Sequence, residues 1–93
     1  MPSGPVRPLM SIGVPVYNGE RHLRAALDSA LAQDYPNLEI LISDNVSTDG
    51  TEAIARHYIR SDSRVRYWRN PVNIGAVKNF GHVLAEARGR YFT

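Results

Sequence analysis

The fold class is decided by five consecutive residues, Leu38-Glu39-Ile40-Leu41-Ile42, which form a nearly continuous apolar run. Pro36 and Asn37 break the chain before this run, and the polar residues Ser43-Asp44-Asn45 end it. A strand that is apolar on both faces is typical of a parallel sheet covered on both sides. We therefore predict a buried strand at residues 38–42, with other layers packed above and below it.

Upstream of this run, the sequence shows one strand pattern and one helix pattern. Residues 9–16 are rich in apolar and β-branched side chains, which favour a strand. Residues 20–33 place Leu23, Leu27 and Leu31 at helical spacing. The first half of the chain is thus predicted to be strand, helix, strand.

Downstream, the same alternation continues. Side-chain oxygens that can cap a helix precede a helical pattern at residues 51–59, and a short strand follows at residues 65–68. A third helix is predicted up to Gly89 from the spacing of five apolar residues, Val77, Phe80, Val83, Leu84 and Ala87. Tyr91 and Phe92 begin a fourth strand. Strands joined by helices predict an α/β fold, an open and mostly parallel Rossmann-like sheet with helices on both faces.

Length and composition limit the function classes. The 93 residues predict one small domain, with a flexible lead-in at residues 1–8 and the folded part at residues 9–93. The absence of Cys excludes disulfides and thiolate metal sites, and a net charge of +2 with scattered Arg argues against a nucleic-acid partner. No apolar run reaches the ~18 residues of a membrane span, and no signal peptide is recognisable, so we expect a cytoplasmic protein without a membrane span.

Ligands of open α/β sheets bind beyond the carboxyl ends of the strands, so the functional residues are expected in the strand-to-helix turns. We call these segments the first turn (residues 15–19), the second turn (residues 43–47) and the third turn (residues 70–75). The first turn lacks the glycines of a dinucleotide fingerprint, which argues against NAD or FAD.

The first and second turns offer groups suited to a nucleobase. Pro15, Val16 and Tyr17 combine a rigid residue, exposed backbone and an aromatic face for stacking, although Tyr17 read on its own fits a packing or surface role better than a base contact. Asp44 can accept the ring N–H of uracil, and Asn45 can accept one hydrogen bond and donate another. The alternative is that Asp44 and Asn45 only cap the loop before the second helix.

Five ordered motifs cover most of the chain from about Pro8 to Thr93. They are Ser11-Ile12-Gly13-Val14-Pro15-Val16-Tyr17-Asn18, Ser29-Ala30-Leu31-Ala32-Gln33, Ser43-Asp44-Asn45-Val46-Ser47-Thr48-Asp49-Gly50-Thr51, Asn73-Ile74-Gly75 and Ala87-Arg88-Gly89-Arg90-Tyr91-Phe92. Together they resemble the start of the family-2 glycosyltransferases. The resemblance implies part of a glycosyltransferase A-type fold and an inverting transfer from a nucleotide-diphospho-sugar donor, of UDP type, to an acceptor hydroxyl.

The resemblance also implies site residues. Pro15, Val16 and Tyr17 match the family's base-binding turn, and Asp44 matches its acid at the end of the second strand. Asn45 stands where many members have a second acid, so which of Asp44 and Asn45 meets the base stays open. Lys78 occupies a position where some members have a basic residue near the nucleotide, although a solvated helix face would also explain it.

Finally, the resemblance implies a divalent metal, Mg or Mn. In the family, the acidic ligands of this metal and the catalytic base that deprotonates the acceptor hydroxyl occur after the strand that begins at Tyr91. We therefore expect the 93 residues to be an N-terminal, truncated part that is inactive alone. The alternatives are a stand-alone, non-catalytic nucleotide-binding module and a basic structural or nucleic-acid-contacting fragment. An uncovered fourth strand would also favour self-association through the sheet edge, which sedimentation would detect.

Overall fold

The computed structural model describes residues 8–92, so the predicted lead-in lies almost wholly outside the described residues. Four parallel strands form one sheet in the order β3-β2-β1-β4, namely β1 (Met10–Val16), β2 (Leu38–Asp44), β3 (Val65–Arg69) and β4 (Arg90–Phe92). Each pair of consecutive strands is joined by one helix, and these are α1 (Leu23–Leu31), α2 (Thr51–Ser61) and α3 (Ala76–Glu86). The open parallel α/β sheet predicted from the sequence is confirmed.

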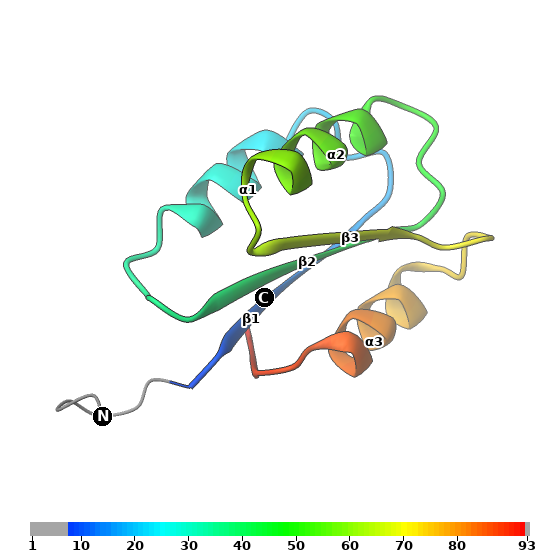
Figure 1. Ribbon diagram of the computed structural model, residues 1–93. Coiled ribbons are helices and arrows are strands. Elements are labelled where there is room, and N and C mark those ends of the chain that lie inside the picture. The colour runs from blue at the N-terminus through cyan, green and yellow to red at the C-terminus, as the bar shows by residue number, and fades with distance from the viewer. Residues whose placement is uncertain (1–7, 93) are drawn as a thin grey trace, which may run out of the picture.

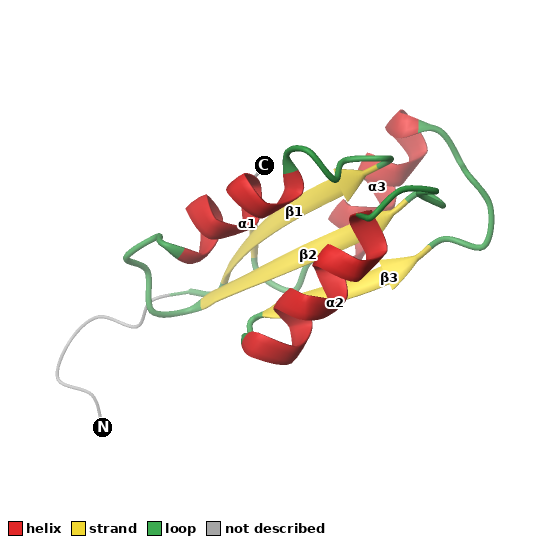
Figure 2. Cartoon of the chain, turned by 90° about the horizontal axis from the view of Figure 1, so that it is seen from above, coloured by secondary structure: helices red, strands yellow, loops and turns green. Residues whose placement is uncertain are grey.

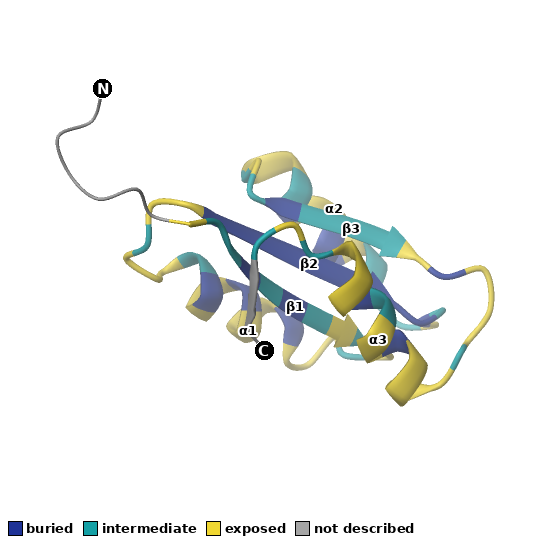
Figure 3. Ribbon diagram, turned by 90° about the horizontal axis from the view of Figure 1, so that it is seen from below, coloured by how far each residue is buried: buried dark blue, intermediate teal, exposed yellow. Residues whose placement is uncertain are grey.

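The helices form a layer on each face of the sheet. Figures 1 and 2 show α1 and α2 side by side on one face and α3 on the other. All seven residues of β2 are buried, as its apolar run predicts, and Figure 3 shows β2 as the most deeply covered strand. The main core lies between the sheet and the α1–α2 layer, around Leu23, Leu27, Ile40, Ile42 and Ile54. No helix in the described part of the chain is both long and apolar enough to cross a membrane.

The bounds of all three helices differ by a few residues from those predicted, and two of the differing ends have an identifiable local cause. α1 begins at Leu23, because residues 20–22 form a turn whose backbone bonds return to Gly19. α3 ends at Glu86, and Ala87 is already extended, so Gly89 does not terminate the helix. Instead, a side chain at Gly89 would collide with the backbone of Leu9, which makes this glycine necessary where the chain enters β4.

The face that α3 turns to the sheet also differs from a simple apolar stripe. Its buried residues are Asn79 and Val83, whereas Val77 is 86% exposed and Leu84 is 43% exposed. The reason is local, because the first part of α3 lies over the polar end of β2, where backbone groups need hydrogen-bond partners. An amide side chain therefore occupies a position that spacing alone assigns to the core.

A buried carboxylate at the opposite end of β2 holds three strands and a loop together. The Ser11 hydroxyl of β1 donates to Glu39 Oε2 at 2.6 Å, and the Arg88 N–H of the α3–β4 connection donates to the same oxygen at 2.8 Å. Arg66 of β3 approaches Glu39 Oε1 at 3.4 Å, and the Gly89 N–H donates to the Ser11 hydroxyl at 3.0 Å. Burial alone would raise the pKa of Glu39, but these hydrogen bonds and the Arg66 charge lower it.

We predict that Glu39→Gln destabilises the fold by about 1–3 kcal/mol at pH 7, because it removes the charge that these buried donors face. The lowered pKa means that this stabilisation is complete above the unfolded value, near 4.5, and is lost as the pH falls through the folded value. Urea unfolding of both chains at pH 7 and below pH 4 measures the difference, which should shrink in acid.

The matched control is Glu86→Gln, a carboxylate that also faces Arg66 but has a side chain 47% exposed. Its loss should stay within about 0.5 kcal/mol. Equal losses for the two variants, or a Glu39→Gln loss that ignores pH, would contradict the role assigned to Glu39.

Candidate functional site

The three strand-to-helix turns meet at the carboxyl end of β2. The Asn45 N–H donates to the Val16 carbonyl at 2.8 Å, which joins the second turn to the first. The Asn70 N–H donates to the Asp44 carbonyl at 2.8 Å, which joins the third turn to the second. The segments that parallel topology was expected to bring together are therefore in direct contact.

Side chains reinforce the junction between the first and second turns. The Asn18 N–H donates to Ser47 Oγ at 2.8 Å, and Asn18 Oδ1 accepts from the Thr48 N–H at 2.7 Å. The Gly19 N–H donates to Thr51 Oγ1 at 2.9 Å. Asn18 has a φ of 50°, a left-handed conformation that Asn tolerates better than most residues. These bonds fix the backbone that follows β1 and carries Tyr17.

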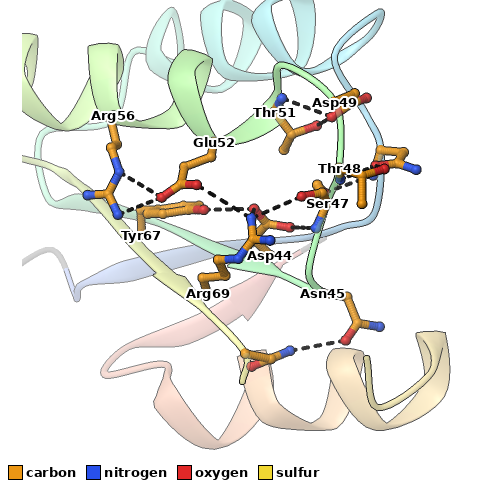
Figure 4. Close-up of polar contacts among 12 residues, drawn as sticks. Asp44, Asn45, Ser47, Thr48, Asp49, Thr51, Glu52, Arg56, Tyr67 and Arg69 are labelled. Carbon is orange, nitrogen blue, oxygen red and sulfur yellow. Dashed lines mark hydrogen bonds and ion pairs between the residues drawn. The ribbon is translucent and has the colours of Figure 1, made fainter. Parts of the chain in front are cut away.

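Asp44 leaves β2 toward the α2 side of the sheet and is fully buried. Its Oδ1 accepts from the Ser47 N–H at 2.9 Å, and its Oδ2 accepts from the Tyr67 hydroxyl at 2.7 Å. Arg69 Nη1 lies 3.7 Å from the same oxygen (Figure 4). The bond to Ser47 is the loop-capping contact that the sequence left open as the alternative for Asp44. The carboxylate is thus enclosed by partners from the protein itself.

Charged groups around Asp44 extend this cluster to α2. Arg69 Nη1 donates to the Ser47 carbonyl at 3.0 Å and lies 3.5 Å from Glu52 Oε1. The Arg56 guanidinium lies over the Tyr67 ring at 5.4 Å from its centre. Burial raises the pKa of Tyr67, and the hydrogen bond to Asp44 and the negative charge of that group add to the effect. Tyr67 therefore remains a neutral donor throughout the physiological pH range.

The backbone between these anchors is strained. Val46 has a φ of 66°, in the left-handed region that a β-branched residue rarely adopts. Such a conformation costs on the order of 1–3 kcal/mol and persists only where neighbouring contacts enforce it. Here the flanking residues are held by the bonds of Asn45 to Val16 and of Ser47 to Asp44. The second turn is accordingly fixed before any ligand is present.

A pocket of ≈ 200 Å³ opens on the other side of the β2 end, between the first turn and α3. Its lining residues are Pro15, Val16, Tyr17, Asn45, Asn73, Ala76 and Asn79. Four of the six residues predicted to bind substrate, Pro15, Val16, Tyr17 and Asn45, are therefore brought together. Asp44 and Lys78 are not among the lining residues, since Asp44 points to the opposite face and Lys78 is exposed on α3.

Asn73 and Asn79 line the pocket but were not predicted as site residues. Asn73 belongs to the Asn73-Ile74-Gly75 motif, which was the sequence signal that could have identified it. Asn45 Nδ2 donates to Asn73 Oδ1 at 2.9 Å, and this contact between residues distant in sequence could not be predicted from a local pattern. Asn79 is anchored to β2, because its Nδ2 donates to the Ser43 carbonyl at 2.9 Å and its Oδ1 accepts from the Ser43 hydroxyl. Both amides attach the start of α3 and the third turn to the end of β2.

Comparison with known proteins identifies the family. The model of glycosyl transferase family 2 matches residues 11–93. The chain belongs to glycosyl transferase family 2. An uncharacterized glycosyltransferase of Rickettsia typhi is 41% identical over 86 residues, which are 92% of this chain and 26% of that protein. The putative teichuronic acid biosynthesis glycosyltransferase TuaG of Bacillus subtilis is 35% identical over 85 residues, 91% of this chain and 34% of that protein.

Solved structures show the same glycosyltransferase fold. The mannosyltransferase PcManGT of Pyrobaculum calidifontis, in complex with GDP-Man and Mn²⁺, gives a TM-score of 0.81 at 28% identity over 90% of this chain and 26% of that protein. TarS of S. aureus, in complex with UDP, gives 0.78 at 30% identity over 87% of this chain and 25% of that protein. The family 2 chain described here thus spans about a quarter to a third of the length of these relatives.

The metal ion in the Pyrobaculum relative raises the question of a metal site in this family 2 chain. Within residues 8–92, no three His, Cys, Asp or Glu side chains gather in a way that could hold a metal ion. Asp44, the residue before the pocket residue Asn45, is enclosed by Ser47, Tyr67 and Arg69, and Asn45 itself is an amide. Asp44 and Asn45 thus offer no carboxylate oxygen that is free of a protein partner to a metal at this end of β2.

We predict that Asp44→Asn destabilises the domain by about 1–3 kcal/mol, because it replaces a buried charged acceptor that faces Tyr67 and Arg69. Tyr67→Phe should cost about 1 kcal/mol, because it removes one of the hydrogen bonds to the same carboxylate. Chemical denaturation of both variants and of the double variant gives the coupling between the two residues.

The double variant should lose less stability than the sum of the two single losses, because the shared hydrogen bond is counted twice in that sum. Asp34→Asn, in an exposed loop position, is the matched control and should change stability by no more than about 0.5 kcal/mol. Fully additive losses would show that Asp44 and Tyr67 act independently.

Proposed function

We propose that this chain is the nucleotide-sugar-binding portion of a glycosyltransferase that moves a sugar from a UDP-type donor to an acceptor hydroxyl. One observation carries the proposal: a pocket at the carboxyl ends of β1 and β2 is lined by four of the six residues expected from the sequence to bind substrate, namely Pro15, Val16, Tyr17 and Asn45. This is the place at which open α/β sheets bind nucleotides, beside the point where strand order reverses between β1 and β4.

The pocket chemistry suits a flat, polar ring. Tyr17 is 54% exposed at the pocket wall, so its ring can stack on a base without first leaving a packed position. Pro15 and Val16 add apolar surface from the end of β1, and the amides of Asn45 and Asn79 supply polar groups on the other side. An apolar wall with a few fixed polar groups is the usual composition of a small-molecule site.

The relatives support the same ligand class. The Pyrobaculum structure contains GDP-Man, and the TarS structure contains UDP, so proteins with this fold hold nucleoside diphosphates with different bases. For this chain, the uracil base, Lys78 as a further contact and a Mg or Mn ion held outside residues 8–92 are parts of the proposal. Asp44, which the sequence also suggested as a base contact, is instead assigned to support of the second turn, because its oxygens are bonded to Ser47 and Tyr67. We also propose self-association through the β4 edge and a cytoplasmic location.

We predict that Tyr17→Ala weakens UDP binding about tenfold, because base–aromatic stacking contributes about 1–3 kcal/mol per base. Isothermal titration of the 93-residue chain with UDP, with and without Mg²⁺, measures this change. The fold should be unaffected, since Tyr17 is exposed.

The control is Val72→Ala, because Val72 is 63% exposed in the third turn and does not line the pocket. This variant should bind UDP like the parent chain. Equal weakening by both variants, or no effect of Tyr17→Ala on measurable binding, would place the nucleotide elsewhere. Tight binding that does not depend on a metal would favour the alternative of a non-catalytic nucleotide-binding module.

We further predict that the 93 residues alone transfer no sugar. The leaving diphosphate develops charge that must be neutralised, and residues 8–92 hold no ligand set for a metal that would do so. A donor-dependent assay with a panel of nucleotide-sugars and a generic acceptor measures turnover. Sugar transfer by the purified chain, abolished by Tyr17→Ala, would overturn this prediction while leaving the binding site in place.

A further inference from the structure

Three backbone groups fix how the pocket amides are oriented. The Ile74 N–H can only donate, and it lies 2.9 Å from Asn45 Oδ1. The Gly75 N–H likewise donates to Asn73 Oδ1 at 2.8 Å. The Ser43 carbonyl can only accept, and it receives Asn79 Nδ2 at 2.9 Å. Because backbone donors and acceptors cannot exchange roles, the oxygen and nitrogen of all three carboxamides are assigned without ambiguity.

With this orientation, each carboxamide oxygen already accepts two hydrogen bonds. Asn45 Oδ1 accepts from Ile74 and from Asn70 Nδ2 at 3.3 Å. Asn73 Oδ1 accepts from Gly75 and from Asn45 Nδ2. A carboxamide oxygen has two lone pairs, so neither oxygen has capacity left for a ligand.

The third amide shows the same saturation. Asn79 Oδ1 accepts from the Ser43 hydroxyl at 2.5 Å and from Asn70 Nδ2 at 3.0 Å. All three amides that line the pocket are therefore without a free acceptor.

The nitrogens are different. Each NH₂ group has two donors, and the described structure shows one protein partner for Asn45 Nδ2 and one for Asn79 Nδ2. Each group therefore keeps one N–H, although both residues are only 2% exposed and line the pocket. A buried N–H without a partner is unfavourable, so a ligand atom that accepts these hydrogens is bound preferentially. Asn73 adds further donors at the exposed edge of the same pocket.

We propose that the side-chain amides of this pocket recognise acceptor atoms of the ligand only. Resting on the proposed function, this means that the amides of Asn45 and Asn79 donate to the carbonyl oxygen at position 2 of the nucleobase. The ring N–H of uracil is not bound by Asn45, contrary to the acceptor role that the sequence left open for this residue.

The inference has a consequence for base selectivity. Uracil and cytosine share the carbonyl at position 2 but differ at position 3, where uracil has an N–H and cytosine a bare nitrogen. A carboxylate at position 45 would accept from the uracil N–H and would repel the cytosine nitrogen. An amide that donates to the carbonyl at position 2, which both bases share, makes neither distinction. Asn45 thus relaxes discrimination between the two pyrimidines.

The test compares UDP and CDP binding to the 93-residue chain and to Asn45→Asp by isothermal titration. For the parent chain, we expect the two dissociation constants to agree within tenfold. Asn45→Asp should shift the ratio at least tenfold further toward UDP, because the new carboxylate accepts from one base and repels the other. Gln33→Glu makes the same change of an exposed amide to an acid outside this pocket and should leave the ratio unchanged.

The possible outcomes separate the inference from the proposed function. If both nucleotides bind but the parent chain prefers UDP by more than tenfold, the inference is wrong and the nucleotide site stands. An unchanged ratio in a folded Asn45→Asp chain would also overturn it. If Asn45→Asp does not fold, as circular dichroism would show, the ratio of the parent chain decides. If neither nucleotide binds, the proposed function fails, and this inference fails with it.

Discussion

The structure depends on what two adjacent residues do at the end of β2. Successive side chains of a strand point to opposite faces, so Asp44 enters the α2 side and Asn45 the α3 side. Asp44 is bonded to the second turn and β3, and Asn45 is bonded to the third turn. Their backbone groups join the first and third turns as well. One dipeptide therefore sets the position of every loop that shapes the pocket. Asp44 supports the second turn on one face, and Asn45 lines the pocket on the other.

The features that the sequence predicted depend on local patterns. The apolar run of β2, the leucine spacing of α1 and the polar residues that end the strands each reflect the periodicity of one element. Parallel topology then places the carboxyl ends of β1, β2 and β3 at one edge. For that reason Pro15, Val16, Tyr17 and Asn45 could be assigned to a common site before any contact among them was known.

The features that escaped prediction depend on partners distant in sequence. Asp44 was a candidate base contact because it ends a strand, but its hydroxyl partner, Tyr67, follows 23 residues later. Glu39 can stand within an apolar run because the Ser11 hydroxyl and a backbone N–H 49 residues downstream donate hydrogen bonds to its carboxylate. Asn79 sits in the helical repeat at a buried position because a carbonyl of β2 needs a donor there. No periodicity within a single element carries this information.

The shape of the pocket and its hydrogen-bonding character cannot be separated. Asn45 positions the third turn by accepting from Ile74, and Asn79 positions α3 by bonding to both Ser43 groups. The same bonds saturate the amide oxygens, whereas the described structure gives Asn45 Nδ2 and Asn79 Nδ2 one protein partner each. A substitution that freed an acceptor in this pocket would have to release a turn or a helix at the same time. The oxygen of Asn73 faces Asn45 Nδ2, so an acid at position 45 would require the Asn73 amide to turn around. The buried polar network therefore restricts which side chains in the pocket are compatible with this backbone.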